Sequence, residues 1–205
     1  MSAAATVVAE VEIPISERGP SPRKVIVGYG FWLFLLSDII LFSALFAAYA
    51  VLSGRSAGGP GGVQLFHRDS VLIETGCLLL SSFTCALMSL AIEVRHRGLM
   101  VVGAALTLAL GAGFLWLELT EFAGMIAHGA GPSRSAFLSA FFALVGMHGL
   151  HVAIGLCWLV SMVAQVFTLG WRPMVVGRLA CFSLFWHALD IVWIGVFTIV
   201  YLGAR

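Results

Sequence analysis

The sequence contains five apolar runs, each long enough to cross a lipid bilayer as a helix. Crossing a hydrocarbon core of roughly 30 Å takes about 20 residues at the rise of an α-helix. Short polar or glycine-rich loops separate the runs. The sequence therefore predicts an all-α polytopic membrane protein, a bundle of five transmembrane helices. The predicted spans are about 25–52, 70–92, 99–127, 136–168 and 179–202.

Composition agrees with this fold class and excludes several kinds of function. The chain is 60% hydrophobic and only 10% charged, whereas a soluble domain carries about a quarter charged residues. A net charge of +1, with lysine and arginine scattered through short loops, argues against nucleic acid as a partner. The four cysteines lie inside apolar runs without the spacing of a disulfide framework or a Cys-x-x-Cys metal site, which favours small buried hydrophobes.

The charged residues outside the spans predict the domain organisation and the orientation. Residues 1–24 contain three prolines and mixed charge without an apolar face, which predicts a disordered tail before a transmembrane domain of residues 25–205. Five helices place the termini on opposite sides. The positive-inside rule assigns the side with more basic residues to the cytoplasm, which predicts a cytoplasmic N-terminus. The N-terminal side holds Arg18, Arg23, Lys24, Arg95, Arg97, Arg172 and Arg178, and the other side holds Arg55, Arg68, Arg134 and Arg205.

Eight acidic and histidine side chains lie within or at the ends of the predicted spans. Each is costly in lipid and is expected to face the bundle interior with a partner. Three pairs among them are spaced i, i+3, which puts both members on one helix face. Depth along the helices predicts one layer near the midplane and another nearer the non-cytoplasmic surface. The midplane layer holds Asp38, His148, His151, His187 and Asp190, and the other holds Glu74, Glu118 and Glu121, with His128 beyond them.

Two interpretations of these residues stay open. Carboxylates and histidines inside a membrane can form a proton or ion pathway, and they can also be hydrogen-bonding contacts between helices. Hydrogen bonding is the better interpretation for the midplane histidines, and the two are about equal for Asp38 and Glu74. Asp38 is a candidate neutral acid near lipid. The proton-related candidates are Asp38, Glu74, Glu118 and Glu121, and the predicted interhelical polar network is His148, His151, His187 and Asp190.

A metal or haem site is not predicted in this chain. Cofactors in helical bundles take ligands from facing helices, such as paired Glu-x-x-His motifs. Glu118 and Glu121 lack a histidine three residues on, and His148 and His151 lack the i, i+4 spacing of a metal-binding pair. The chain is therefore expected to contain no catalytic, cofactor-binding or metal-binding residue of its own.

Four segments carry a resemblance to a known family. They are GFWLFLLSD at 30–38, ELTEF at 118–122, FFALVGMHGLHV at 141–152 and FWHALDIVW at 185–193. Together they resemble subunit III of haem-copper terminal oxidases over nearly the whole chain beyond the tail. Five helices and an Asp at position 38 resemble the cytochrome o ubiquinol oxidase branch, since the cytochrome c oxidase versions usually have seven helices and a Glu there.

The resemblance implies a multi-pass subunit of the bacterial inner membrane with no redox centre of its own. The orientation predicted from the basic residues then puts its C-terminus in the periplasm. The subunit would pack directly on subunit I, which carries haem b, haem o and copper, beside subunits II and IV. The complex would oxidise ubiquinol, reduce oxygen to water and pump protons. Subunit III would stabilise it, support proton uptake and bind phospholipid.

The alternatives within this fold are a subunit III of a cytochrome c oxidase or of a nitric oxide reductase-associated complex. A free-standing transporter or proton channel is the alternative from another class. It is disfavoured because the sequence contains no repeated halves or broken helices.

Overall fold

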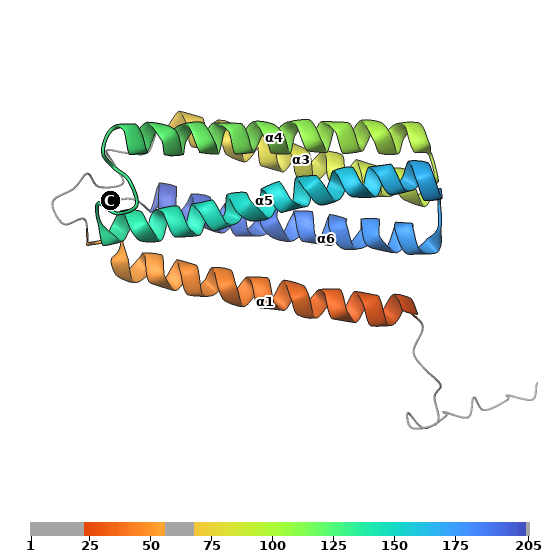
Figure 1. Cartoon of the computed structure of the whole chain (residues 1–205), viewed down its shortest axis with the longest axis horizontal. Coiled ribbons are helices and arrows are strands. Elements are labelled where there is room, and N and C mark those ends of the chain that lie inside the picture. The colour runs from red at the N-terminus through yellow and green to blue at the C-terminus, as the bar shows by residue number, and fades with distance from the viewer. Residues whose placement is uncertain (1–22, 56–67, 204–205) are drawn as a thin grey trace, which may run out of the picture.

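The computed structural model describes residues 23–55 and 68–203, and within them the chain is helical and contains no strand. All five long helices are long and apolar enough to cross a membrane, which confirms the predicted fold class. The helices are α1 (Arg23–Leu52), α3 (Arg68–Glu93), α4 (Arg97–Ala127), α5 (Ala136–Leu169) and α6 (Pro173–Val196), the last continued by the π-helical segment η2 (Phe197–Leu202) (Figure 1).

The bounds of the helices follow from local signals. The Ser135 side chain accepts a hydrogen bond from the backbone N–H of Leu138 and so caps α5. Gly170 ends that helix with a φ of 72°, and Pro173 opens α6 at its first turn, where its missing N–H costs nothing. The last helix thus begins at 173, six residues before the predicted start at 179. The predicted start was too late because the exposed Arg178 lowers the hydropathy of the first turns. The predicted tail lies outside the described residues apart from positions 23 and 24, which begin α1.

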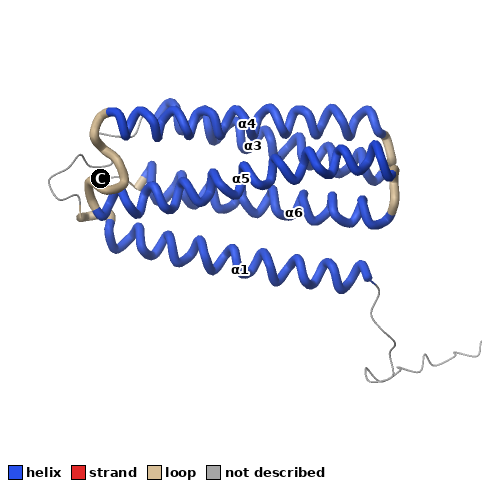
Figure 2. The backbone as a smooth tube through the Cα atoms, in the orientation of Figure 1, coloured by secondary structure: helices blue, strands red, loops and turns tan. Residues whose placement is uncertain are grey.

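Four of the helices form a bundle, and α1 lies at its edge. Helix α3 packs on α4 and α6, and α5 packs on the same two helices, whereas α1 packs mainly on α5 and α6. Figure 1 shows α1 diverging from the bundle toward its N-terminal end, and the tube in Figure 2 shows the turns gathered at the two ends of the bundle. The turns α3–α4 and α5–α6 share the end from which α1 begins.

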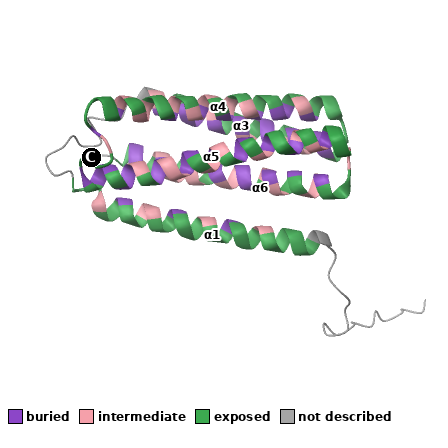
Figure 3. Cartoon of the chain, in the orientation of Figure 1, coloured by how far each residue is buried: buried purple, intermediate pink, exposed green. Residues whose placement is uncertain are grey.

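Glycines on α4 and α5 make room for the largest side chain of the core. A Cβ built at Gly111 or Gly155 would lie 3.0 Å from the nearest Trp186 ring atom, so the indole from α6 occupies space that two missing side chains provide. Large apolar side chains also cover the outside, and Figure 3 shows exposed positions along every helix, most of all α1. This pattern suits a bundle that packs small residues inside and presents apolar residues to lipid.

Helices α3 and α4 approach each other closely at Gly103. A Cβ at this position would lie 2.9 Å from Met88 Cβ and 3.1 Å from its Cα. Backbone atoms cannot turn aside as the end of a long side chain can, so a larger residue here must push the helices apart. The same contact sits one turn from a hydrogen bond of 2.8 Å between the hydroxyls of Thr84 and Thr107.

We expect Gly103→Ala to destabilise the protein by about 1 to 3 kcal/mol, the usual cost of overpacking. Gly113→Ala on the same helix is the matched control, because no atom lies within 4 Å of a Cβ there, and alanine is the better helix former by about 1 kcal/mol. Thermal unfolding in detergent should show a lower midpoint for the first variant only. Equal midpoints would contradict the close packing of α3 on α4.

Candidate functional site

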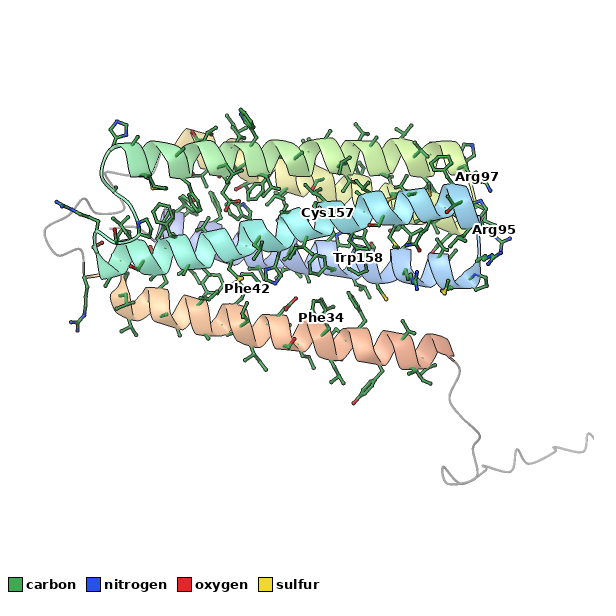
Figure 4. All side chains as sticks on the ribbon, in the orientation of Figure 1. Phe34, Phe42, Arg95, Arg97, Cys157 and Trp158 are labelled. Atoms are coloured by element: carbon green, nitrogen blue, oxygen red, sulfur yellow. The ribbon has the colours of Figure 1, made fainter. Side chains whose placement is uncertain are left out.

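The pair formed by Asp38 and His151 joins α1 to α5. Asp38 Oδ1 lies 3.8 Å from His151 Nε2. His151 Nδ1 lies 2.8 Å from the Met147 carbonyl oxygen, and because a carbonyl only accepts, Nδ1 carries a proton. Phe42 lies against the same imidazole with its ring centroid 5.2 Å away, and Figure 4 shows it pointing from α1 toward α5. The proton that can be shared in this pair is therefore the one between Nε2 and the carboxyl group.

A second polar group lies in the contact between α3 and α6. The Ser82 hydroxyl is 2.6 Å from His187 Nδ1, and the buried Asp190 carboxyl group lies within hydrogen-bonding reach of the same hydroxyl. His187 and Asp190, spaced i, i+3 on α6, thus converge on one serine of the neighbouring helix. Asp190 Oδ2 has no hydrogen-bond partner among the described residues.

A third group consists of three carboxyl groups, on α3 and α4. Glu74 and Glu118 are almost fully buried, and Glu121 is partly buried. They lie close enough to interact electrostatically with one another and with Tyr201 of η2. Gly149 of α5 makes room for one of them, since a Cβ there would lie 2.5 Å from Glu118 Oε1. Both carboxyl oxygens of Glu74 lack a hydrogen-bond partner within the described part of the chain.

His148 does not make the interhelical polar contacts that the sequence predicts for it. It is fully buried, and within the described ranges neither ring nitrogen has a hydrogen-bond partner. Its neighbours are aromatic: the ring centroids of Trp193, Phe114 and Phe42 lie 5.1, 5.7 and 6.4 Å away. The i, i+3 spacing from His151 did bring both rings against Phe42, but only His151 faces a carboxyl group.

The structure thus divides the eight predicted residues among separate places. The proton-related candidates do not form one cluster, because Asp38 lies between α1 and α5 while Glu74, Glu118 and Glu121 gather around η2. Three carboxyl groups this close in a water-poor interior repel one another when charged. Nowhere in residues 23–55 and 68–203 do three His, Cys, Asp or Glu side chains form a group that could hold a metal ion.

Sequence reasoning missed the hydroxyl groups that receive these side chains. Thr75, Ser82 and Ser89 recur every seven residues along α3, and each bonds to α6. Thr75 Oγ1 accepts from Trp193 Nε1 at 3.1 Å, and the hydroxyl oxygens of Ser89 and Ser183 lie 3.0 Å apart. The seven-residue spacing keeps side chains on one helix face, so it was a usable signal.

Comparison with known proteins gives consistent results. Residues 18–204 match the family described as cytochrome c oxidase subunit III. A protein of Pseudomonas aeruginosa named cytochrome bo(3) ubiquinol oxidase subunit 3 is 51% identical over 174 residues, covering 85% of this chain and 83% of the relative. Its namesake from Pseudomonas putida is 52% identical over 173 residues, covering 84% of each.

A more distant relative has a similar name. Quinol oxidase subunit 3 of Bacillus subtilis is 45% identical over 176 residues, covering 84% of this chain and 85% of the relative. The family match spans all five helices, including the segments that hold Asp38, Glu118, His151 and Asp190. The chain belongs to the cytochrome c oxidase subunit III family.

Proposed function

We propose that this chain is subunit III of a proton-pumping ubiquinol oxidase of the cytochrome bo(3) type. The observation that carries the proposal is identity of 51 to 52% over most of the chain to proteins that bear that name. The oxidase would oxidise ubiquinol and reduce oxygen to water in the bacterial inner membrane. A bundle of five helices also fits the quinol oxidase branch better than the usual seven helices of the cytochrome c oxidase versions.

The redox centres would lie in another subunit. In this proposal subunit I binds haem b, haem o and copper, contacts this chain directly, and is accompanied by subunits II and IV. The donor set of the chain supports this division, because the three histidines within the spans have other neighbours: His151 lies beside Asp38, His187 beside Ser82, and His148 in an aromatic pocket. The chain would stabilise the complex, bind phospholipid and support proton uptake.

The polar side chains would divide between these roles. Ser82, His187 and Asp190 join α3 to α6 inside the bundle, which suits assembly. The Asp38 and His151 pair suits proton exchange better, because it is partly exposed, with 20% and 15% of the side-chain surface accessible. The pair lies between the edge helix α1 and α5.

The orientation would place the N-terminus in the cytoplasm and the C-terminus in the periplasm. Arg95 and Arg97 lie at the same end of the bundle (Figure 4), and Arg97 reaches toward the α5–α6 turn, 3.9 Å from where a Gly170 Cβ would lie. With Arg172 and Arg178 beside that turn, this end carries the larger share of the basic residues.

The first test is co-purification of the affinity-tagged chain from its native membrane under mild detergent. We expect it to bring down a complex with a haem absorption spectrum and ubiquinol oxidase activity, while the chain expressed alone shows neither a Soret band nor stoichiometric metal. Recovery of cytochrome c oxidase activity instead would move the chain to the other branch of the family. Recovery without haem from the native membrane would refute the proposal.

Two substitutions separate assembly from proton uptake. Asp190→Leu should lower the amount of this chain retained with the complex, because an interhelical polar contact is worth about 0.6 to 2 kcal/mol, and the haem spectrum of the remaining core should stay normal.

Asp38→Asn should keep full subunit content but lower turnover at alkaline pH, where proton supply is scarce. The matched controls are Ile191→Leu, at an exposed position beside Asp190, and Ser37→Ala, at an exposed position beside Asp38. If the Asp190→Leu subunit stayed fully bound to the complex while the complex lost quinol oxidation, Asp190 would serve proton uptake rather than assembly.

Topology can be tested with a reporter enzyme that is active only outside the cytoplasm. We expect activity when the reporter is fused after Arg205 and no activity when it is fused after Arg97, since the positive-inside rule puts the α3–α4 turn in the cytoplasm. A reporter active only inside the cytoplasm should give the opposite results at both positions. The inverted pattern in both assays would overturn the orientation.

A further inference from the structure

An apolar groove runs along the outer surface between α3 and α4, next to the turn that joins them. Its volume is about 280 Å³. Small residues, Thr84, Ala91 and Gly103, are buried along its floor. Exposed aliphatic side chains form its two rims, with Leu87, Leu90 and Val94 on α3 and Leu99, Val102 and Leu106 on α4.

The dimensions of the groove match one leaflet of a bilayer. The lining on α3 runs from Thr84 to Val94, which is about 15 Å at the rise of an α-helix. One leaflet accounts for half of a hydrocarbon core of roughly 30 Å, again about 15 Å. The groove therefore has the length that a single acyl chain of one leaflet would occupy.

A basic turn closes the groove at the membrane surface. Arg95 follows the rim residue Val94 directly, is exposed, and its guanidinium has no hydrogen-bond partner in the described part of the chain. Its φ of 54° is one that glycine adopts freely and an L side chain rarely does. Arg97 lies at the same end of the bundle (Figure 4), and Glu93 is the acidic residue nearby in the sequence. The turn thus presents a free guanidinium where a lipid headgroup would lie.

We propose that this groove binds an anionic phospholipid, one acyl chain lying between α3 and α4 and Arg95 holding the headgroup phosphate. Hydrocarbon suits the aliphatic rims, and the small residues of the floor let the chain lie close to the helix backbones. A planar guanidinium pairs well with phosphate oxygens, and the net positive charge of the turn favours an anionic lipid. The inference rests on the proposed function, in which the chain binds phospholipid, and adds to it the place of the lipid and the charge of its headgroup.

Photocrosslinking in nanodiscs tests the proposal on the full chain, purified with whatever subunits accompany it. The nanodiscs are phosphatidylcholine with a minor fraction of phosphatidylglycerol that carries a diazirine in its acyl chain. Mass spectrometry of peptides should find adducts concentrated on residues 84–106. Unlabelled phosphatidylglycerol should compete for them, and additional phosphatidylcholine should not.

Variants of the turn and of the floor test the two halves of the site separately. Arg95→Gln should lower the crosslinking about fivefold, as expected for one arginine at an anionic surface, while Arg95→Lys should retain most of it. Arg134→Gln, at the other end of the bundle, is the charge control. Ala91→Leu should fill the floor and lower the crosslinking, whereas Ala86→Leu on the same helix but outside the groove should not.

Results of three kinds would overturn the proposal. The first is labelling spread evenly over all lipid-facing helix surfaces. The second is equal competition by phosphatidylcholine, or crosslinking that Arg95→Gln leaves unchanged. The third is absence of adducts on residues 84–106 because an accompanying subunit covers the groove. Arg95→Gln leaves the packing of the bundle intact, so its result stands even where Ala91→Leu fails to fold.

Discussion

The absence of water inside a bilayer is the constraint on which this structure depends. A polar group that water would satisfy in a soluble protein must here find its partner on its own helix or on a neighbour. Contact between helices therefore depends on close packing at small residues and on a few polar contacts. Gly103 against Met88, and Trp186 against Gly111 and Gly155, supply the packing. Ser82 with His187, and Asp38 with His151, supply the polar contacts.

The fold could be predicted from the sequence because bilayer thickness sets the length of a helix. The run that became α4 was recognisable from its apolar residues alone. The start of α6 was missed because hydropathy treats Arg178 as a boundary, although an arginine on an outer turn can extend toward the membrane surface and bond to Gln165, as it does here at 2.9 Å. Proline at the first turn was the better signal.

The site was predicted less completely, and the reason is geometric. Periodicity places a residue on a face of its helix, but it does not say which helix lies opposite. His148 and His151 share a face, yet only His151 meets Asp38, whereas His148 lies among aromatic rings. Tyr201 joined the carboxyl cluster because a π-helical segment continues α6, and nothing in the residue types of that segment specifies such a turn.

The hydroxyl groups along α3 have a consequence for the way the chain enters the membrane. Thr75 and Ser89 each donate a hydrogen bond to a carbonyl of their own helix, at 2.8 and 3.0 Å, so they are satisfied before any neighbour arrives. Glu74 and Asp190 have no such local partner. A newly inserted α3 or α6 therefore carries carboxyl groups that are costly in lipid, while its hydroxyl groups add little to that cost.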